Sequence, residues 1–152
     1  MSAEARLLAI KEIGKLKAAY FRCMDTKNWG EFPDLFTADA VFDVRGALEP
    51  PKSEEEHAKE PVVNGRAAIV EYVRSGISPL TSVHHGHMPE IEILSGTSAK
   101  GIWAMEDMLI IPPGGPFKKF QGWGHYFETY RYEGRWRIET LKLRRLYVEI
   151  TA

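Results

Sequence analysis

The chain has 152 residues, of which 44% are hydrophobic and 27% charged, a balance typical of one globular domain with one core. Its 20 basic and 21 acidic residues give a net charge of −1, so charge favours neither nucleic acid nor an anionic membrane as a partner. No apolar run reaches the roughly 20 residues of a membrane helix, and the N-terminal segment lacks the apolar stretch of a signal peptide. The single cysteine, Cys23, lies in an apolar helical pattern, which indicates a reduced core thiol and a cytoplasmic protein.

The first part of the chain predicts two helices and a short strand. Apolar residues at three- and four-residue steps predict a helix from Ala3 to about Met24. Residues 31–36 can form at most a turn or two of helix, and the apolar residues of 41–44 suggest a short strand. A second helix is predicted from Arg66 to about Ser75, with Gly76 placed to end it.

The segment from Leu48 to Pro61 separates these elements and predicts an exposed loop. It is polar, acidic and interrupted by prolines, and no period in it would bury one face. His57 within it is expected to be a solvated loop residue. A long loop beside a cavity can also serve as a lid, and that alternative stays open.

The second half of the chain predicts strands joined by short turns. The strands expected are residues 80–94, 100–111, 117–132 and 135–150. The turn signals between them are Ser95–Ser98, Pro112–Pro116 and Glu133–Gly134. Bulges or sharp bends are expected at Gly86, Pro89, Gly122 and Gly124. Helices followed by an antiparallel meander predict an α+β fold in which a strongly bent sheet wraps around helices on one face.

Asp107 is the acid that the strand pattern sets in apolar surroundings. Alternation along an extended strand places its side chain on the same face as Trp103, Met105, Leu109 and Ile111. Burying an unpaired carboxylate is costly, so the group is expected to hold its proton or find a cation. Because such perturbed acids gather at active sites, we expect Asp107 to have an imidazole or a guanidinium as its partner.

Three of the five histidines lie close together, at positions 84, 85 and 87. Strict alternation places His85 and His87 on one face of a strand and His84 on the other, and a one-residue bulge at Gly86 or Pro89 would exchange the faces. The alternation alone does not decide which histidine faces a cavity. Adjacent histidines point apart and no third ligand is evident, so no metal site is expected.

Three further residues are candidates for a site. Asp25 follows the first helix, where the helix C-terminus disfavours its charge unless a cation is near, and a carboxylate there can orient a histidine. Tyr20 lies on the apolar stripe of that helix, and its hydroxyl needs a partner if it is buried. Arg145 is expected to share a face with Leu141, Leu143 and Tyr147, so it needs an acid or a ligand oxygen, and Asp107 is the natural candidate.

The order of these motifs carries a family resemblance. The stretches LKAAYFRCMDTKNW, FTADAVFDV, TSVHHGHMPEIEI, AKGIWAMEDML and GRWRIETLKLRRLYV resemble the SnoaL-like group of the nuclear transport factor 2-like superfamily. Within it the chain looks similar to bile-acid 7α-dehydratase and, more distantly, to scytalone dehydratase and hexachlorocyclohexane dehydrochlorinase. The resemblance covers nearly the whole chain except residues 48–61, and it implies one cone-shaped domain with an apolar cavity at one end.

Residue by residue, the resemblance implies that Asp25 and His84 form an acid-base dyad beside Tyr20, Asp107 and Arg145. It selects His84, a choice that the alternation left open. The activity implied is removal of water from a hydroxylated, steroid-like or polycyclic substrate without a cofactor. Isomerisation of a ketosteroid type and non-catalytic binding of an apolar ligand remain the alternatives. The side chains expected to contact such a substrate are Trp103, Met105, Met88, His125 and Tyr147.

The last strand also predicts self-association. Trp136 and Ile138 alternate onto one face and Leu141 onto the other, and Val148 returns to the first, so both faces are partly apolar. A large apolar surface seldom stays exposed in a soluble protein. We therefore expect a homotrimer or homodimer built through the outer face of the sheet, as the resemblance also implies.

Overall fold

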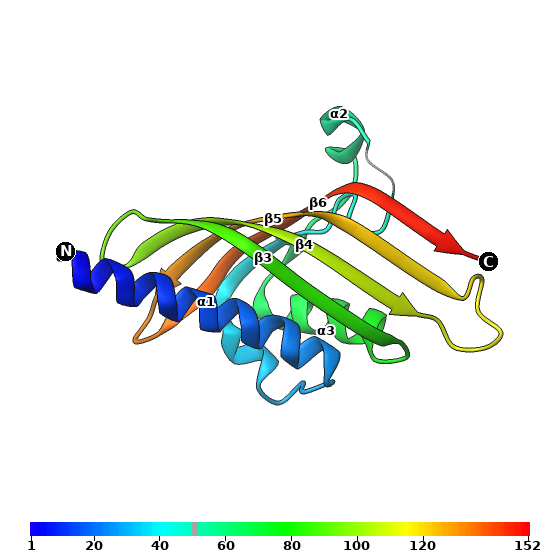
Figure 1. Ribbon diagram of the computed structural model, residues 1–152, viewed down its shortest axis with the longest axis horizontal. Helices are drawn as coiled ribbons and strands as arrows, with labels where there is room; N and C mark the ends of the chain where they lie inside the picture. Colours follow the sequence, from blue (N-terminus) through cyan, green and yellow to red (C-terminus); the bar gives the residue numbers. More distant parts are fainter. Residues whose placement is uncertain (50–51) are drawn as a thin grey trace.

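A curled six-stranded sheet carries helices α1 and α3 on one face, while the short helix α2 lies beyond the other face (Figure 1). The computed structural model describes residues 1–49 and 52–152. The elements in chain order are α1 (Ala3–Asp25), the 3-10 helix η1 (Phe32–Leu35), β1 (Phe36–Asp43), α2 (Glu54–His57), β2 (Val63–Asn64), α3 (Arg66–Ile77), β3 (Thr81–Ile93), β4 (Ser98–Ile110), β5 (Lys119–Tyr132) and β6 (Trp136–Thr151). The strands lie in the order β2-β1-β6-β5-β4-β3. The α+β prediction, with helices packed in a bent sheet, is confirmed.

Helix α1 forms where the apolar period predicted it, one residue longer than expected. Ser2 caps its start by accepting a hydrogen bond from the Ala5 backbone N–H, which satisfies one of the donors a helix N-terminus leaves free. The buried side includes Ile13, Leu16 and Cys23, so the expected buried thiol is present. This packing brings the end of α1 against β3, and that contact positions the candidate site.

The four long strands and the turns between them lie where the sequence predicted them. The pairing of β1 with β6 was not predicted. Strands β3 to β6 form an antiparallel meander with the three predicted connections. Strand β1 begins at Phe36 instead of near Val41, and it pairs in parallel with β6, so the sheet is not wholly antiparallel. A parallel pair has no turn signal of its own, since its two strands are far apart in the chain.

Bulges decide which side chains share a face. The register shifts between His87 and Glu90 in β3 and between Trp123 and Gly124 in β5, as the glycine and proline positions suggested. Opposite the second shift, Gly124 pairs with Arg145 and Trp123 with Tyr147. The prediction that Arg145 and Tyr147 share a face is therefore wrong, because the extra residue of β6 reverses the alternation.

A third register shift, between Thr129 and Tyr130, explains the apolar pattern of the last strand. Ile138 and Leu141 are both buried, with 0% and 1% of their surface exposed, so the shift places them in the same core instead of on opposite faces. The expectation that Ile138 belongs to an outer interface is therefore wrong. The prediction of self-association then depends on other side chains of the outer face.

Two predictions for the segment before β3 need correction. His57 is 3% exposed at the end of α2, a helix capped by Ser53 and Glu56, so it is not a solvated loop residue. The three glutamates before it gave the segment the pattern of an exposed loop, so the one buried position was not predicted. Helix α3 continues through Gly76 to Ile77, since the proline that cannot continue a helix is Pro79. Of the predicted loop, residues 50 and 51 lie outside the described residues.

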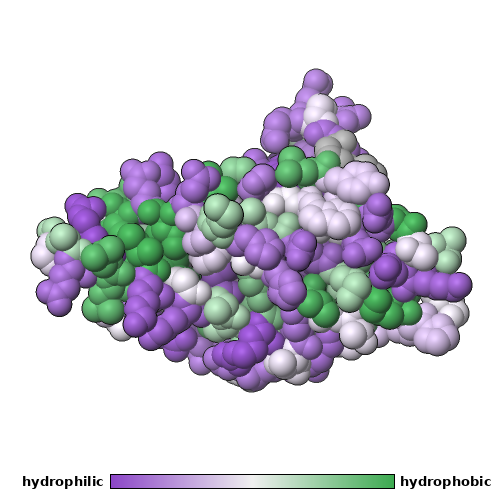
Figure 2. All heavy atoms as spheres, viewed as in Figure 1, coloured by the Kyte–Doolittle hydropathy of each residue, from purple (hydrophilic) through white to green (hydrophobic). Residues whose placement is uncertain are grey.

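Polar and charged side chains cover much of the surface in one view, and hydrophobic atoms gather near the start of α1 (Figure 2). Leu7 and Leu8 of that helix are 68% and 58% exposed. Within the ranges 1–49 and 52–152, no helix is both long and apolar enough to cross a membrane.

A charged network lies inside the core, between α1 and the sheet. Lys17 Nζ donates to Glu128 Oε2 at 2.7 Å, and both side chains are fully buried. The Tyr130 hydroxyl donates to Glu128 Oε1 at 2.7 Å and accepts from Trp103 Nε1 at 2.9 Å. The amine also lies 3.5 Å from the centre of the Tyr126 ring. The network thus gives each charge a partner within an apolar interior.

This network makes the stability of the fold depend on pH. Burial lowers the pKa of Lys17 from 10.5 to about 8, against the opposing effect of Glu128. Burial of the charged amine therefore lowers the free energy of unfolding, and this destabilisation is complete below pH 8. It disappears as pH approaches 10.5, because the Lys17 amine of the unfolded chain then also loses its proton. We expect the free energy of unfolding to rise by about 2 kcal/mol between pH 8 and 10, relative to a Lys17→Met/Glu128→Gln variant. Urea unfolding at each pH measures this difference, and parallel curves for the two proteins would contradict it.

Candidate active site

An apolar cavity of about 470 Å³, here called the inner cavity, lies between the sheet, α1 and α3. Its walls are mostly apolar side chains: Met24, Phe42, Ala47, Leu48, Tyr72, Val73, Ile77, Leu80, Leu109 and Leu143. Its polar lining includes Tyr20, His84, Asp107, Tyr126 and Arg145. Leu48 and Tyr72 are 59% and 40% exposed, so they mark where the inner cavity meets the surface. An apolar chamber with a few convergent polar groups is the usual form of a small-molecule site.

Asp25 and His84 meet where the end of α1 lies against β3. His84 Nδ1 lies 2.7 Å from Asp25 Oδ1, and the His84 backbone N–H donates to Asp25 Oδ2 at 2.7 Å. The Ser82 hydroxyl, two residues earlier on β3, donates to Asp25 Oδ1 at 2.9 Å. Three hydrogen bonds to one carboxylate fix its orientation.

These contacts select one tautomer of His84. An ionised carboxylate accepts hydrogen bonds only, so Nδ1 carries the proton and Nε2 keeps its lone pair when the ring is neutral. The ring is stacked on Phe21 of α1, with centroids 6.0 Å apart and planes 14° apart. Asp25 therefore holds one edge of the imidazole and Phe21 covers one of its faces. The other nitrogen, Nε2, is the one free to act in the inner cavity.

Asp107 of β4 and Arg145 of β6 form a buried pair across the strand between them, β5. Arg145 Nη1 and Nη2 donate to Asp107 Oδ1 and Oδ2 at 2.6 and 2.9 Å, and Nε donates to the Ala47 carbonyl at 2.7 Å. Gly122 leaves room for the pair, since a Cβ there would lie 2.9 Å from Asp107 Oδ1 and closer still to the guanidinium. Both carboxylate oxygens are thus bound by one planar cation.

The pair lies next to the imidazole. His84 Nε2 is 3.7 Å from Asp107 Oδ2, which is too long for a direct hydrogen bond. The guanidinium offsets the negative charge of Asp107, and a positive charge that forms on His84 would lie between the carboxylates of Asp25 and Asp107.

Two tyrosines complete the polar lining. Burial, followed by the influence of neighbouring Tyr126, raises the pKa of Tyr20 well above its usual 10. Burial also raises the pKa of Tyr126, with Asp107 contributing in the same direction. Both phenols therefore keep their protons at neutral pH and can donate hydrogen bonds into the inner cavity.

The structure brings four of the five predicted acid-base residues to the inner cavity, and the fifth, Asp25, lies directly behind His84. The predicted substrate contacts lie elsewhere. Met88 is 89% exposed at the β3 bulge, and Tyr147 is 55% exposed and stacked on Trp123. Because these bulges reverse alternation, a strict period placed both side chains on the wrong face.

The remaining predicted contacts lie close to the inner cavity without lining it, or face the outside of the sheet. Trp103 is bonded to Tyr130 in the core, and Met105 is buried with its sulfur 3.7 Å from Arg145 Nη1. His125 pairs with Arg144 on the face that carries α2. Sequence reasoning missed Tyr126, which a period of two along β5 places with Gly122 on the inner face. It also missed the wall formed by α3, for which the chain has no local signal.

The other histidines of the cluster lie outside the inner cavity. His85 Nδ1 and His87 Nε2 are 3.4 and 3.7 Å from Glu106 Oε1, and all three side chains are about half exposed. Among residues 1–49 and 52–152, no group of three or more His, Cys, Asp or Glu side chains is arranged to hold a metal ion.

The fold and site together define a helix-filled cone with a buried acid-base cluster at the end of an apolar chamber. A family model described as the SnoaL-like domain matches residues 5–142, so the chain belongs to the SnoaL-like family, within the nuclear transport factor 2-like superfamily. The sequence-based recognition of this family is confirmed.

Solved structures share this fold at low sequence identity. A hexachlorocyclohexane dehydrochlorinase, LinA type 2, has a TM-score of 0.81 and 17% identity over 99% of this chain and 94% of its own. A candidate scytalone dehydratase from Novosphingobium aromaticivorans has a TM-score of 0.80 and 18% identity over 99% and 93%. A protein of unknown function from Mycobacterium tuberculosis has a TM-score of 0.75 and 22% identity over 95% and 76%. At these identities the likeness establishes the fold alone.

Proposed function

We propose that the protein is a cofactor-independent lyase that removes water from a hydroxylated, apolar substrate. One observation carries this proposal: His84, hydrogen-bonded to Asp25 through Nδ1, lines an apolar chamber and has its Nε2 beside the Asp107–Arg145 pair. Similarity to a dehydrochlorinase and to a candidate scytalone dehydratase supports elimination as the type of reaction.

The reaction follows from the positions of these groups. His84 Nε2 takes a proton from a carbon of the substrate, and Asp25 stabilises the imidazolium that forms. The electron pair of the broken C–H bond forms a C=C bond as the C–O bond to the neighbouring hydroxyl breaks. That hydroxyl leaves as water after taking a proton, for which Tyr20 and the imidazolium are the donors at hand. Asp107 and Arg145 hold the leaving hydroxyl or another substrate oxygen.

The substrate class follows from the walls. A volume of about 470 Å³ falls within the range of roughly 300–1,000 Å³ usual for small-ligand sites. The apolar walls favour a rigid multi-ring skeleton, and the polar groups at one end require oxygen substituents there. A hydroxylated steroid or a comparable polycyclic compound meets both conditions.

Isomerisation is the second candidate, because the same base with two protonated phenols could move a proton and stabilise an oxyanion. In ketosteroid isomerase, a protonated aspartate shares that role with a tyrosine. Here Arg145 donates to both oxygens of Asp107, so this carboxyl group is already engaged and does not serve as the second donor to an oxyanion, which makes elimination the better match.

A mass-spectrometric screen separates the candidates. The purified protein is incubated with hydroxylated steroids and polycyclic ketones, with a strong chelator present since no metal is expected to take part. Loss of one water from a substrate, abolished in His84→Ala, is the expected result. A product of unchanged mass would indicate isomerisation. Absence of any product across the panel, with ligands retained unaltered, would favour a binding protein.

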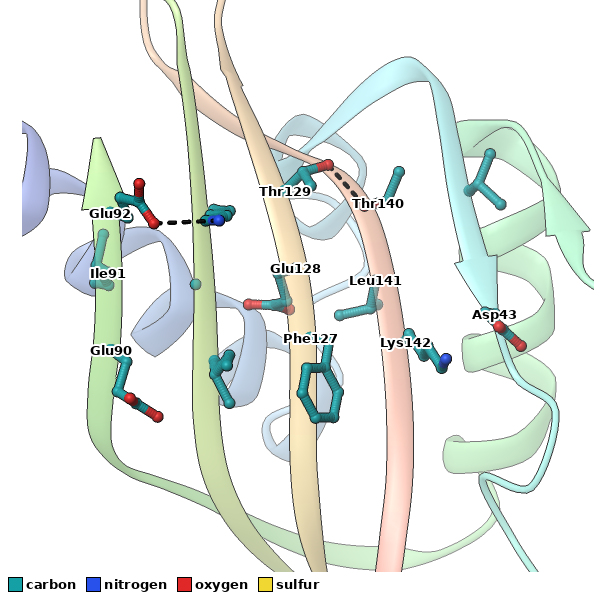
Figure 3. Close-up of a pocket in the computed structure, with 14 residues that line it drawn as sticks. Asp43, Glu90, Ile91, Glu92, Phe127, Glu128, Thr129, Thr140, Leu141 and Lys142 are labelled. Atoms are coloured by element: carbon teal, nitrogen blue, oxygen red, sulfur yellow. Dashed lines mark hydrogen bonds and ion pairs between the residues drawn. The ribbon is translucent and has the colours of Figure 1, made fainter. Parts of the chain in front are cut away.

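The outer face of the sheet supports the further proposal of a homotrimer or homodimer. A hollow of about 720 Å³ lies on the face opposite α1 and α3, with Phe127 at its centre (Figure 3). Its rim carries both signs of charge: Glu92 of β3 is paired with Lys100 at 3.2 Å, and Lys142 of β6 lies 3.7 Å from Glu54. Phe127 is 41% exposed and is the apolar side chain that a second copy would cover.

We expect light scattering to give a multiple of 17.3 kDa at micromolar concentration, and Phe127→Asp to lower the mass to that of one chain. Leu7→Asp, an equally drastic change at an exposed position of α1, is expected to leave the assembly intact. A wild-type mass near 17.3 kDa would contradict the proposal, and an assembly that survives Phe127→Asp would place the interface elsewhere.

A further inference from the structure

A hydrogen-bonded chain extends from the dyad to a lysine that neither the family resemblance nor the sequence pattern had singled out. Lys27 Nζ donates to Ser82 Oγ at 3.2 Å, and Ser82 Oγ donates to Asp25 Oδ1 at 2.9 Å. The same Asp25 oxygen accepts from His84 Nδ1 at 2.7 Å. The ammonium can only donate and the carboxylate can only accept, so the Ser82 hydroxyl accepts from Lys27 and donates to Asp25.

The backbone of Lys27 is unusual for its residue type. It lies two residues beyond the end of α1 with φ of 59°, in the left-handed region where helices usually place glycine. A side chain is strained in that region, so glycine would suit the backbone better than lysine. The side chain is nevertheless present and turned back to Ser82, which is 4% exposed.

The positive charge of Lys27 stabilises the negative charge of Asp25 at the C-terminus of α1. Asp25 ends α1, where the carbonyl groups of the helix disfavour a negative charge. Burial lowers the pKa of Lys27, and the charge of Asp25 acts in the opposite direction. A cation near this carboxylate keeps it ionised and, in addition, opposes premature protonation of the imidazole beyond it.

We infer that Lys27 and Ser82 are positioning residues that keep Asp25 ionised and His84 in its Nδ1–H form, ready to accept a proton at Nε2. This inference rests on the proposed function, because it assigns their effect to the base of that reaction. Neither residue lines the inner cavity. They act on His84 through the hydrogen bonds of Asp25 and through the positive charge of Lys27, and together they set the pH range in which His84 serves as the base.

The decisive variant is Lys27→Gly. Glycine fits the positive φ, so the helix end is kept and the melting temperature is expected to stay equal or rise. Loss of the cation makes the charged imidazole more favourable, so the acid limb of the kcat/KM profile moves to higher pH by about half to one unit. That shift corresponds to a loss of roughly 3- to 10-fold in kcat/KM on the acid limb, with recovery at higher pH. Lys27→Arg is expected to restore most of the wild-type profile.

Ser82→Ala tests the link between the two charges, and combined with Lys27→Gly it is expected to add little to the larger single effect. Lys15→Met removes the same charge from the exposed face of α1, 63% exposed in its side chain, and should leave the profile unchanged. Nitrogen NMR of the His84 ring reports its tautomer and its titration midpoint without any substrate. In Lys27→Gly the midpoint should move up with the acid limb.

The NMR measurement separates two failures. If no substrate is turned over, the proposed function fails, while a shifted His84 midpoint still supports the role of Lys27. If the His84 midpoint and the acid limb both stay at their wild-type values in Lys27→Gly and Ser82→Ala, the inference is overturned and Lys27 only serves the helix end.

Discussion

Replacing Asp25 with asparagine, or His84 with alanine, is expected to lower kcat by about 100- to 10,000-fold, the usual range for a positioned general base. In Asp25→Asn a neutral amide would replace the carboxylate to which Nδ1 now donates at 2.7 Å, so the ring would lose the partner that fixes its tautomer and stabilises its charge. His84→Ala removes the base itself. Each variant is assayed on the substrate that the mass-spectrometric screen identifies.

The double variant tests whether the two residues act as one unit. Since Asp25 acts through His84, Asp25→Asn/His84→Ala is expected to be hardly slower than the slower single variant. His85→Ala is the matched control, because that histidine is adjacent in the chain but lies half exposed on the outer face. Losses that multiply in full, or an inactive His85→Ala, would refute the assignment of the dyad.

The regular elements could be predicted because their signals are local. The three- and four-residue period of α1, the proline-glycine turn before β5 and the Glu133–Gly134 hairpin each act within a few residues. The parallel pairing of β1 with β6 joins residues about 100 positions apart, such as Phe36 and Ile138. No pattern in either strand specifies that partner, so the sheet order had to come from the structure.

Some residues of the candidate site could likewise be predicted from local patterns, and others could not. Asp107 and Arg145 were found from sequence because a charge within an apolar period requires an explanation, and the structure pairs them. His84 could not be chosen by alternation, since Gly86 and Pro89 made a bulge plausible. The structure places that bulge after His87, beyond the histidines, so His84 keeps the inner face that it shares with Asp107.

Two of the expected substrate contacts face away from the inner cavity because of bulges. Met88 and Tyr147 each lie at a bulge or directly after one, where one extra residue turns the side chain to the other face. The walls contributed by α3, such as Tyr72 and Val73, depend on how a helix packs against a distant strand. Periodicity indicates that such a helix has an apolar face but not which chamber that face lines.

The pairing of Asp107 with Arg145 links the stability of the fold to the chemistry of the site. Arg145 is 5% exposed and Asp107 6%, so neither charge has access to much water. Asp107 depends on the guanidinium for charge balance, while the segment after β1 depends on it for the bond to the Ala47 carbonyl. Removal of the Arg145 guanidinium is therefore expected to affect His84, Asp107 and the segment that contains Ala47 together.

Arg145→Met is expected to lower the free energy of unfolding by about 3–5 kcal/mol, because it leaves a buried carboxylate without its partner. It should also raise the pH at which His84 becomes neutral, since the charge of Asp107 is then no longer offset. Urea unfolding measures the first effect, and the pH dependence of kcat/KM measures the second.

Adding Asp107→Leu to Arg145→Met separates stability from chemistry. With both charges replaced by apolar groups, much of the lost stability is expected to return, while turnover stays low because the leaving hydroxyl has lost its partner. Arg144→Met is the control on the adjacent residue: its partner Glu54 is 75% exposed, and its other partner, Asp43, keeps Arg45, so the change should cost about 1 kcal/mol. If Arg145→Met proves as stable as Arg144→Met, the Asp107–Arg145 pair does not have the structural role assigned to it. A double variant with wild-type turnover would remove the pair from the reaction.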